Sequence, residues 1–149
     1  GQVIAVGGAD FLANHSRFNL ALALFFAFIL MCGLINLSVG SASAQWAITA
    51  PIFVPMLMLV GYAPETIQSA YRIGDSVTNI ITPMMSYFGL ILAVACRYVK
   101  NLGIGTLIAT MLPYSMIFMV GWSILFYVWV FVLGLPVGPG AETYYNFNQ

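Results

Sequence analysis

The sequence predicts an all-α integral membrane protein, and three observations support this fold class. The 149 residues are 62% hydrophobic and 5% charged, whereas charged residues make up about a quarter of a typical soluble domain. Two uncharged stretches, 18–39 and 104–133, exceed the ~20 helical residues that cross a bilayer. Prolines and small polar residues interrupt the apolar sequence between them. We therefore expect lipid around most of the chain, with any irregular backbone buried in protein or facing water.

Composition also excludes several kinds of partner and site. The formal net charge is zero and only four residues are Lys or Arg, so no basic surface for nucleic acid is expected. Cys32 and Cys96 lie in apolar runs without metal-ligand spacing, which favours simple packing roles. We expect no metal centre and no organic cofactor. No signal peptide is visible, and the start at Gly1 suggests part of a longer protein.

The first elements are predicted to be a surface segment and a hairpin. Residues 1–17 mix apolar and charged side chains, which is typical of a membrane-surface segment. Residues 18–60 are predicted to form a re-entrant helical hairpin, because its second apolar run, 47–60, has only 14 residues and two prolines, while a span needs at least ~17. The small polar stretch 38–46 is the expected loop at the tip.

Residues 64–96 are predicted to form a broken transmembrane helix. Pro64 suits the first turn of a helix, and Glu65 is favourable beside its N-terminal dipole. The stretch 76–83 is rich in β-branched and hydroxyl side chains and ends at Pro83, which disfavours helical geometry at the preceding residue. We therefore place the break at 76–83, with two half-helices meeting inside the membrane.

The remaining chain is predicted to cross the membrane once more. The loop 97–103 contains Arg97 and Lys100, so the positive-inside rule predicts that it is cytoplasmic. Residues 104–133 form the last transmembrane helix, and the aromatic side chains near its end suit an interfacial belt. Residues 134–149 begin with a stretch rich in Gly and Pro, and are expected to form an extracytoplasmic tail.

Two charged residues fall inside the predicted broken helix. Arg72 and Asp75 each cost about 2.5 to 3.5 kcal/mol at mid-bilayer on insertion scales. Their i, i+3 spacing places them on one helical face, so a structural ion pair is one interpretation. Ionisable groups within membrane spans usually have a functional role, however, and we favour that interpretation.

The side chains around Asp75 predict a binding site for a hard cation such as Na⁺, because they offer only oxygen and amide groups. The predicted ion ligands are Asp75, Ser76, Thr78, Asn79 and Thr82.

Arg72 is then available for a carboxylate, which a guanidinium binds with two parallel hydrogen bonds. Trp46, in the predicted hairpin tip, offers an aromatic face for stacking, although anchoring at the interface or packing would explain it equally well.

Several motifs resemble the AbgT family of p-aminobenzoyl-glutamate transporters. The matching stretches are SASAQWA at 41–47, APIFVPM at 50–56, GYAPE at 61–65, AYRIGDSVTNIITP at 70–83, GIGTLI at 103–108 and MLPY at 111–114. The resemblance extends from about residue 11 to 140, and these motifs together are long and specific.

The resemblance implies the second half of a secondary transporter built from inverted repeats, acting as a homodimer in the bacterial inner membrane. It implies transport of p-aminobenzoyl-glutamate, a folate catabolite, coupled to Na⁺ or H⁺, and links the family to sulfonamide export. Positions carried over as substrate-handling residues are Ser43, Trp46, Pro64, Arg72 and Pro83, together with Asp75 on the ion side.

Three other functions remain as alternatives. A related transporter of another organic anion, such as a dicarboxylate, would use Arg72 and the same hydroxyls. An intramembrane aspartyl protease is disfavoured, because Arg72 stands where its motif needs Gly, and Asp10, the only other Asp, lies outside the apolar runs. A purely structural membrane subunit would leave the costly charges at Arg72 and Asp75 unexplained. We therefore expect a transporter and not an enzyme.

Overall fold

The fold was obtained as a computed structural model, which describes residues 2–145, with side chains described from Phe18 onward. Its elements are α1 (Gln2–Val39), α2 (Ala42–Leu59), α3 (Pro64–Thr78), α4 (Phe88–Tyr98), α5 (Ile104–Tyr127) and a π-helical turn η1 (Val128–Val132). In this part of the chain the regular structure is helical, apart from one isolated bridge between Tyr62 and Tyr144. The all-helical prediction is confirmed.

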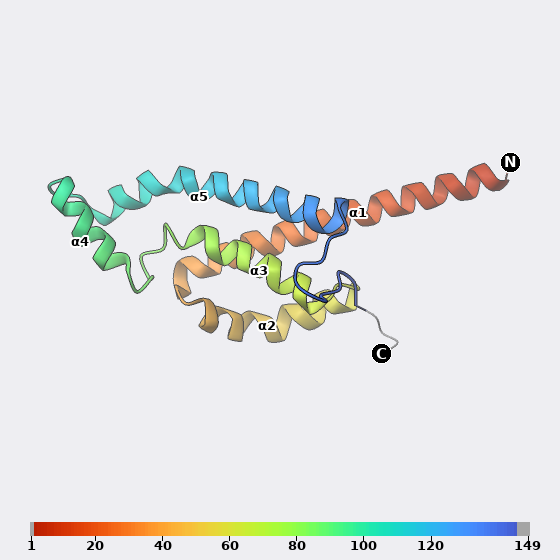
Figure 1. The fold of residues 1–149 in the computed structure, drawn as a ribbon, viewed down its shortest axis with the longest axis horizontal. Helices are drawn as coiled ribbons and strands as arrows, with labels where there is room; N and C mark the ends of the chain where they lie inside the picture. The colour runs from red at the N-terminus through yellow and green to blue at the C-terminus, as the bar shows by residue number, and fades with distance from the viewer. Residues whose placement is uncertain (1, 146–149) are drawn as a thin grey trace.

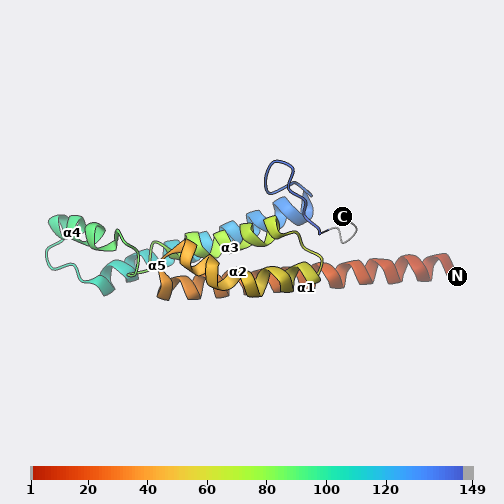
Figure 2. The ribbon, with the colours of Figure 1, turned by 90° about the horizontal axis from the view of Figure 1, so that it is seen from below.

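Helices α1, α2, α3 and α5 lie side by side along one axis, and α4 lies at one end of the molecule (Figure 1). Helix α3 packs most extensively against α1, and it also contacts α2 and α5. A second view shows the same order, with α1 extending beyond the other helices toward the N-terminus (Figure 2). Helix α3 is therefore the central element, and its buried polar side chains, Thr66, Asp75 and Thr78, lie against its neighbours.

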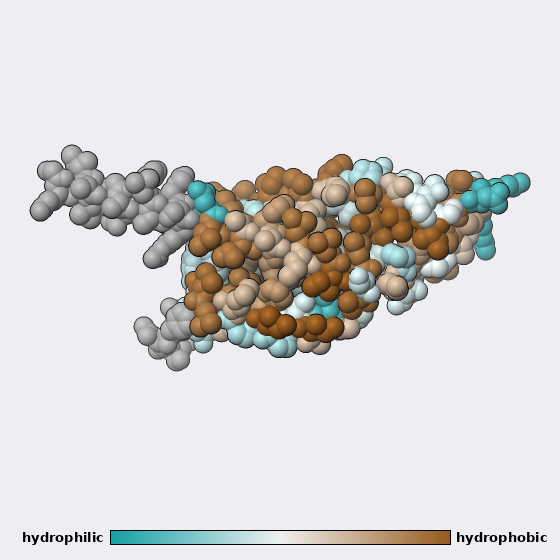
Figure 3. Space-filling view, turned by 180° about the vertical axis from the view of Figure 1, so that it is seen from behind, coloured by the Kyte–Doolittle hydropathy of each residue, from teal (hydrophilic) through white to brown (hydrophobic). Residues whose placement is uncertain are grey.

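Three helical stretches are long and apolar enough to cross a membrane, namely Phe18–Val39, Ala42–Leu59 and Ile104–Val132. Large apolar side chains cover much of the exposed surface, and hydrophilic residues gather at the end where α4 meets α5 (Figure 3). Exposed apolar side chains on this scale would be unfavourable in water. The chain is thus a membrane protein, as its composition predicts.

The hairpin is tighter than the sequence suggests. Helix α1 continues to Val39 and α2 begins at Ala42, so only Gly40 and Ser41 connect them and the predicted loop tip at 38–46 is mostly helical. Gly40 has φ +61°, a conformation that glycine adopts without strain and that reverses the chain within two residues. Because α2 is 18 residues long, length alone allows it to cross, and the re-entrant arrangement stays a prediction.

The tip of the hairpin packs against the irregular segment between α3 and α4. A Cβ added to Gly40 would lie 2.6 Å from the carbonyl oxygen of Met84. That distance is closer than van der Waals contact allows, so this residue must be glycine for space as well as for its φ angle.

The break lies a few residues later than the sequence predicts. Helix α3 continues to Thr78, and residues 79–87 are not helical before α4 begins at Phe88. The hydroxyl of Thr78 donates to the carbonyl of Gly74 at 2.9 Å, a contact within the helix that Thr side chains often make, so its β-branched side chain does not end α3 earlier. Pro83 then lies within the irregular segment instead of closing it.

Close packing of α1 on α3 depends on small residues. A Cβ added to Gly74 would lie 2.9 Å from the Cβ of Cys32 and would overlap the carbonyl oxygen of Ile29. Gly33 faces the same contact from α1, where an added Cβ would lie 3.1 Å from Cγ2 of Thr78. Two glycines thus bring the backbones of α1 and α3 together, as small residues do in membrane helix pairs.

We predict that Gly74→Ala lowers the free energy of unfolding of the full-length protein by about 1–3 kcal/mol, because the added methyl group forces α1 away from α3. The measurement is thermal unfolding of the purified protein in detergent. Gly121→Ala is the matched control, because nothing lies within 4 Å of an added Cβ there, so a neutral or slightly stabilising effect is expected. Equal stability of both variants would contradict the packing argument.

The last described residues fold back on the connection between α2 and α3. The amide of Ala63 donates to the carbonyl of Thr143 at 3.1 Å, and the amide of Tyr145 donates to that of Gly61 at 2.9 Å. Burial raises the pKa of Tyr62, and the neighbouring Tyr144 adds to this rise. The tail lies at the opposite end of the bundle from the loop between α4 and α5 (Figure 1). The segment predicted to be extracytoplasmic is thus at the far end from the loop predicted to be cytoplasmic.

Candidate functional site

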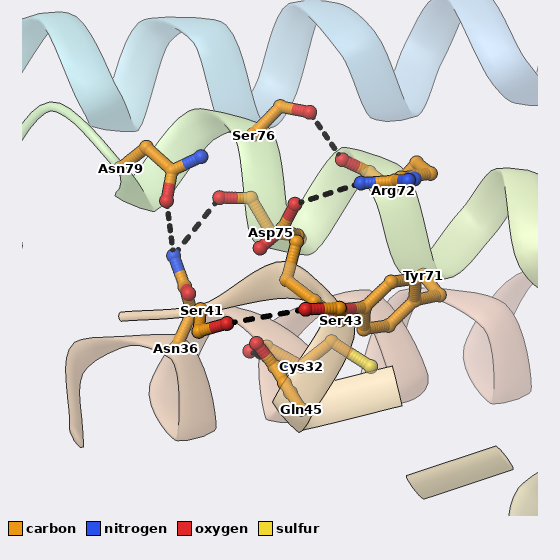
Figure 4. A network of polar contacts seen from close by, with 12 residues as sticks. Cys32, Asn36, Ser41, Ser43, Gln45, Tyr71, Arg72, Asp75, Ser76 and Asn79 are labelled. Atoms are coloured by element: carbon orange, nitrogen blue, oxygen red, sulfur yellow. Dashed lines mark hydrogen bonds and ion pairs between the residues drawn. The ribbon is translucent and has the colours of Figure 1, made fainter. Parts of the chain in front are cut away.

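Polar side chains meet inside the bundle where α1, α2 and α3 come together (Figure 4). Asn36 from α1 and Gln45 from α2 are fully buried, and Asp75 from α3 is 3% exposed. Burying such groups is unfavourable unless they find partners. Their contacts therefore define what this centre can bind.

Asn36 links α1 to the end of α3. Its side-chain nitrogen, Nδ2, lies 3.0 Å from the backbone carbonyl oxygen of Asp75, 2.9 Å from the hydroxyl of Thr78 and 2.8 Å from Oδ1 of Asn79. Thr82 lies in the irregular segment after α3. Its hydroxyl donates to the backbone carbonyls of Asn36 and Leu37 on α1, at 3.3 and 3.2 Å. The end of α1 and the end of α3 are thus tied together at the break.

Helix α2 completes the centre from the hairpin side. The side-chain nitrogen of Gln45, Nε2, donates to the backbone carbonyl of Cys32 at 2.6 Å. Cys32 lies one turn before Asn36 on α1. The hydroxyl of Tyr71 donates to the carbonyl of Ala42 at 2.5 Å. The ring of Trp46 lies 4.7 Å from that of Tyr71 between ring centroids. These contacts hold the first turns of α2 against α1 and α3.

Three buried oxygen atoms of this centre have no hydrogen-bond partner, and each comes from a different helix. They are Oδ1 of Asn36, Oε1 of Gln45 and Oδ1 of Asp75. Unpaired buried acceptors are rare in folded proteins and call for an explanation such as an ion. One carboxylate and two amide oxygens are ligands that suit a hard cation, with Asp75 supplying the negative charge.

Arg72 lies at the exposed edge of this centre and contacts it through Asp75. Its Nη1 is 3.5 Å from Oδ2 of Asp75, and its side chain is 59% exposed while that of Asp75 is 4% exposed. An ion pair this long and this exposed is weak. The guanidinium therefore keeps most of its hydrogen-bonding capacity for another anion.

The structure brings four of the five predicted ion ligands together around Asn36, namely Asp75, Thr78, Asn79 and Thr82. Ser76 does not join them. Its exposed hydroxyl donates to the carbonyl of Arg72 and points toward α5 (Figure 4), because it follows Asp75 by one residue and so lies about 100° further around the helix.

The predicted substrate residues are spread over different surfaces. Ser43 is exposed beside Ser41, with 3.3 Å between their hydroxyl oxygens, and Trp46 packs on Tyr71. Pro64 begins α3, eleven residues before Asp75, which is roughly 16 Å along the helix axis. Pro83 is exposed in the irregular segment. The roles of all five substrate residues, Arg72 included, stay predictions.

Sequence reasoning missed Asn36 and Gln45 as site residues. Asn36 is a polar amide near the end of an otherwise apolar run, and Gln45 stands among small residues at the hairpin tip. Both are costly in a membrane unless they are paired, which was the available signal. Their partners lie 39 and 13 residues away, so the pairing itself is visible only in the fold. Among the described residues, no group of three or more His, Cys, Asp or Glu side chains forms a metal centre.

Comparison with known proteins places this arrangement among transporters. The family model described as "AbgT putative transporter family" matches residues 1–145. The p-aminobenzoyl-glutamate transport protein of Escherichia coli K12 is 36% identical over 140 residues, which are 94% of this chain and 27% of that protein. The chain thus spans about a quarter of this curated relative.

Two solved structures share the fold. The YdaH transporter of Alcanivorax borkumensis, described as having an unusual topology, is 52% identical with a TM-score of 0.76, covering 93% of this chain and 29% of that one. MtrF of Neisseria gonorrhoeae, described as illuminating a class of antimetabolite efflux pumps, is 73% identical with a TM-score of 0.70, covering 80% and 24%.

Proposed function

Because this chain belongs to the AbgT family, whose members are transporters and not enzymes, we propose that it forms part of a secondary transporter of p-aminobenzoyl-glutamate driven by a Na⁺ gradient. The chain contributes the cation site and one carboxylate-binding residue of that protein. The rest of the site lies in the part of the protein that this chain does not cover.

The observation that carries the proposal is the different environment of the two charges of α3. Asp75 is buried against α1 and α2 together with two unpaired amide oxygens, while Arg72, one turn earlier and paired with Asp75 at 3.5 Å, is 59% exposed. A cation near Asp75 would neutralise its charge and leave Arg72 free to bind a substrate carboxylate. One short helix then holds a cation site and an anion site three residues apart.

The position of the cation site next to the break suits coupled transport. Asn36, Thr78 and Thr82 join the end of α1 to the end of α3 at the irregular segment. The last carbonyls of both helices carry partial negative charge, which favours a cation there. Binding of Na⁺ would stabilise this junction, and its release would loosen it, so that the two helices can change their relative position.

Several further features belong to the same proposal. The loop 97–103 is cytoplasmic and the tail is extracytoplasmic, the hairpin 18–60 is re-entrant, and the whole protein is a homodimer of inverted repeats in the bacterial inner membrane. The description of MtrF as belonging to a class of antimetabolite efflux pumps makes export, including export of sulfonamide-type drugs, the second direction to test. Export would require the driving ion to move opposite to the substrate, whereas joint binding of Na⁺ and substrate predicts uptake. Proton coupling is the alternative to Na⁺, since Asp75 is a carboxylate that can accept a proton.

A second candidate is a transporter of aliphatic dicarboxylates. The exposed guanidinium of Arg72 favours it as much as it favours an aryl substrate. The two functions differ in whether an aromatic group contributes to affinity.

The test is flux of radiolabelled p-aminobenzoyl-glutamate in proteoliposomes that contain the full-length protein. We expect flux to rise when a Na⁺ gradient is imposed and to stay low with a K⁺ gradient of equal size. Flux that follows only a pH gradient would replace Na⁺ by H⁺. Absence of flux, together with flux of an aliphatic dicarboxylate, would replace the substrate.

A further inference from the structure

A groove of about 490 Å³ lies between α3 and the end of α5, on the face of α3 that carries Ser69 and Ile73. Its volume is within the ~300–1,000 Å³ of small-molecule sites. One wall is polar and comes from α3, with Ser69, Arg72 and Ser76. The other wall comes from α5 and η1, and includes the indoles of Trp122 and Trp129.

The two walls offer complementary chemistry for one kind of ligand. Arg72 presents a guanidinium that is 59% exposed and that meets Asp75 through Nη1, at 3.5 Å, and it is the only charged residue among those that line the groove. A guanidinium beside flat aromatic surfaces suits a molecule with a carboxylate at one end and an aromatic ring at the other. A purely aliphatic anion would leave the indole wall without a matching surface.

The indole of Trp122 is available for such a ligand. It is 51% exposed and makes no hydrogen bond within the described residues. Trp129 is held in place, because its Nε1 donates to the carbonyl of Pro136 at 3.0 Å. One indole is therefore fixed as a wall, and the other can adjust to a ring.

Trp46 is less suited to this role. It lies on α2, on the hairpin side of the bundle, and its ring already packs against Tyr71. It does not line the groove that contains Arg72. Packing was one of the roles predicted for Trp46, and its contact with Tyr71 agrees with that role. The α5 indoles are better placed to stack on a ligand bound beside Arg72.

We propose that the groove between α3 and α5 is the aryl-binding subsite of the transporter, in which Trp122 and Trp129 hold the aromatic ring of a substrate whose carboxylate binds Arg72. The inference rests on the proposed transport function and assigns its specificity for aryl over aliphatic anions to the end of α5. The same residues would otherwise form a lipid-facing aromatic belt.

The experiment measures equilibrium binding of radiolabelled p-aminobenzoyl-glutamate to the purified full-length protein, with N-acetylglutamate as a competitor that lacks the ring. Trp122→Ala should weaken binding of the aryl ligand about tenfold, and Trp122→Phe should retain most of the affinity. Competition by N-acetylglutamate should be unchanged in both variants. Arg72→Ala should weaken both ligands.

Tyr114→Ala is the matched control, because Tyr114 is a similarly exposed aromatic residue of α5 outside the groove. Its affinity for both ligands should equal that of the wild type. Gel filtration and thermal unfolding check folding, and Trp122→Leu replaces the alanine variant if the latter does not fold.

The outcomes separate this inference from the function on which it rests. Wild-type binding that is lost in Arg72→Ala but unchanged in Trp122→Ala and Trp129→Ala would overturn the aryl subsite and leave the transporter proposal intact. Equal losses for the aryl ligand and for N-acetylglutamate in the Trp122 variant would also overturn it. Absence of wild-type binding would remove the proposed substrate itself.

Discussion

Replacing Asp75 by asparagine is expected to abolish the response of the protein to Na⁺. The substitution keeps the shape of the side chain but removes the negative charge from the centre formed with Asn36 and Gln45. A cation held only by neutral oxygens in a protein interior loses the Coulomb attraction that offsets its dehydration. We expect Na⁺-driven flux to fall at least ~100-fold, which corresponds to a loss of about 3 kcal/mol.

Thermal unfolding measures the same effect without transport. Na⁺ at about 100 times its dissociation constant should stabilise the wild-type protein by roughly 2.7 kcal/mol, and this gain should disappear in Asp75→Asn. Without Na⁺ the variant should be as stable as the wild type or more stable, because a buried charge has been removed. Glu65→Gln is the matched control, since Glu65 is an exposed acid at the start of the same helix. A Na⁺ response that survives in Asp75→Asn would exclude Asp75 as the cation ligand.

Replacing Arg72 by alanine is expected to remove substrate binding while leaving the Na⁺ response in place. The guanidinium is the one exposed charge beside the groove between α3 and α5. Loss of a charged partner for a carboxylate in a binding site costs about 2–5 kcal/mol, so the affinity for p-aminobenzoyl-glutamate should fall by at least ~30-fold. The affinity of Arg72→Lys for this substrate should lie between those of the wild type and Arg72→Ala, because lysine keeps the charge but cannot form the two parallel hydrogen bonds.

Two measurements decide the role of Arg72. Substrate binding and Na⁺-dependent unfolding are compared in the same variants, with Arg97→Ala as the control, since Arg97 lies in the last turn of α4 outside the groove. The expected pattern is loss of the first property and retention of the second. If both properties are lost together in a folded Arg72→Ala protein, the two charges act as one structural ion pair and the division of roles fails.

Hydropathy alone predicted the helical class and the approximate spans, and it did so for a physical reason. Residues 18–39 form one uncharged stretch of 22 residues. Its transfer into lipid is so favourable that turn and cap preferences cannot reverse it. Turn lengths depend on smaller energies. The hairpin closes through Gly40 and Ser41 because of one left-handed glycine, and the end of α3 at Thr78 is bonded to Asn36 of α1. Hydropathy registers neither of these local contacts.

The site shows the same division. Asp75, Thr78, Asn79 and Thr82 could be predicted together because they are close in sequence at a proline-marked break. Ser76 was grouped with them for the same reason, but the rotation of the helix places it on the side of α5. Nearness in sequence thus identified the region of the site and not the face of the helix on which each side chain lies.

The sequence by itself determined that the chain resides in a membrane, that two charges lie within one of its helices, and that its motifs are those of one transporter family. Only the tertiary structure decided that Asn36 and Gln45 share the buried centre of Asp75, and that Arg72 faces the indoles of α5. The physical reason is that solvent preference and local motifs are properties of neighbouring residues. The pairing of groups 39 residues apart depends on how closely Gly33 and Gly74 let α1 and α3 approach.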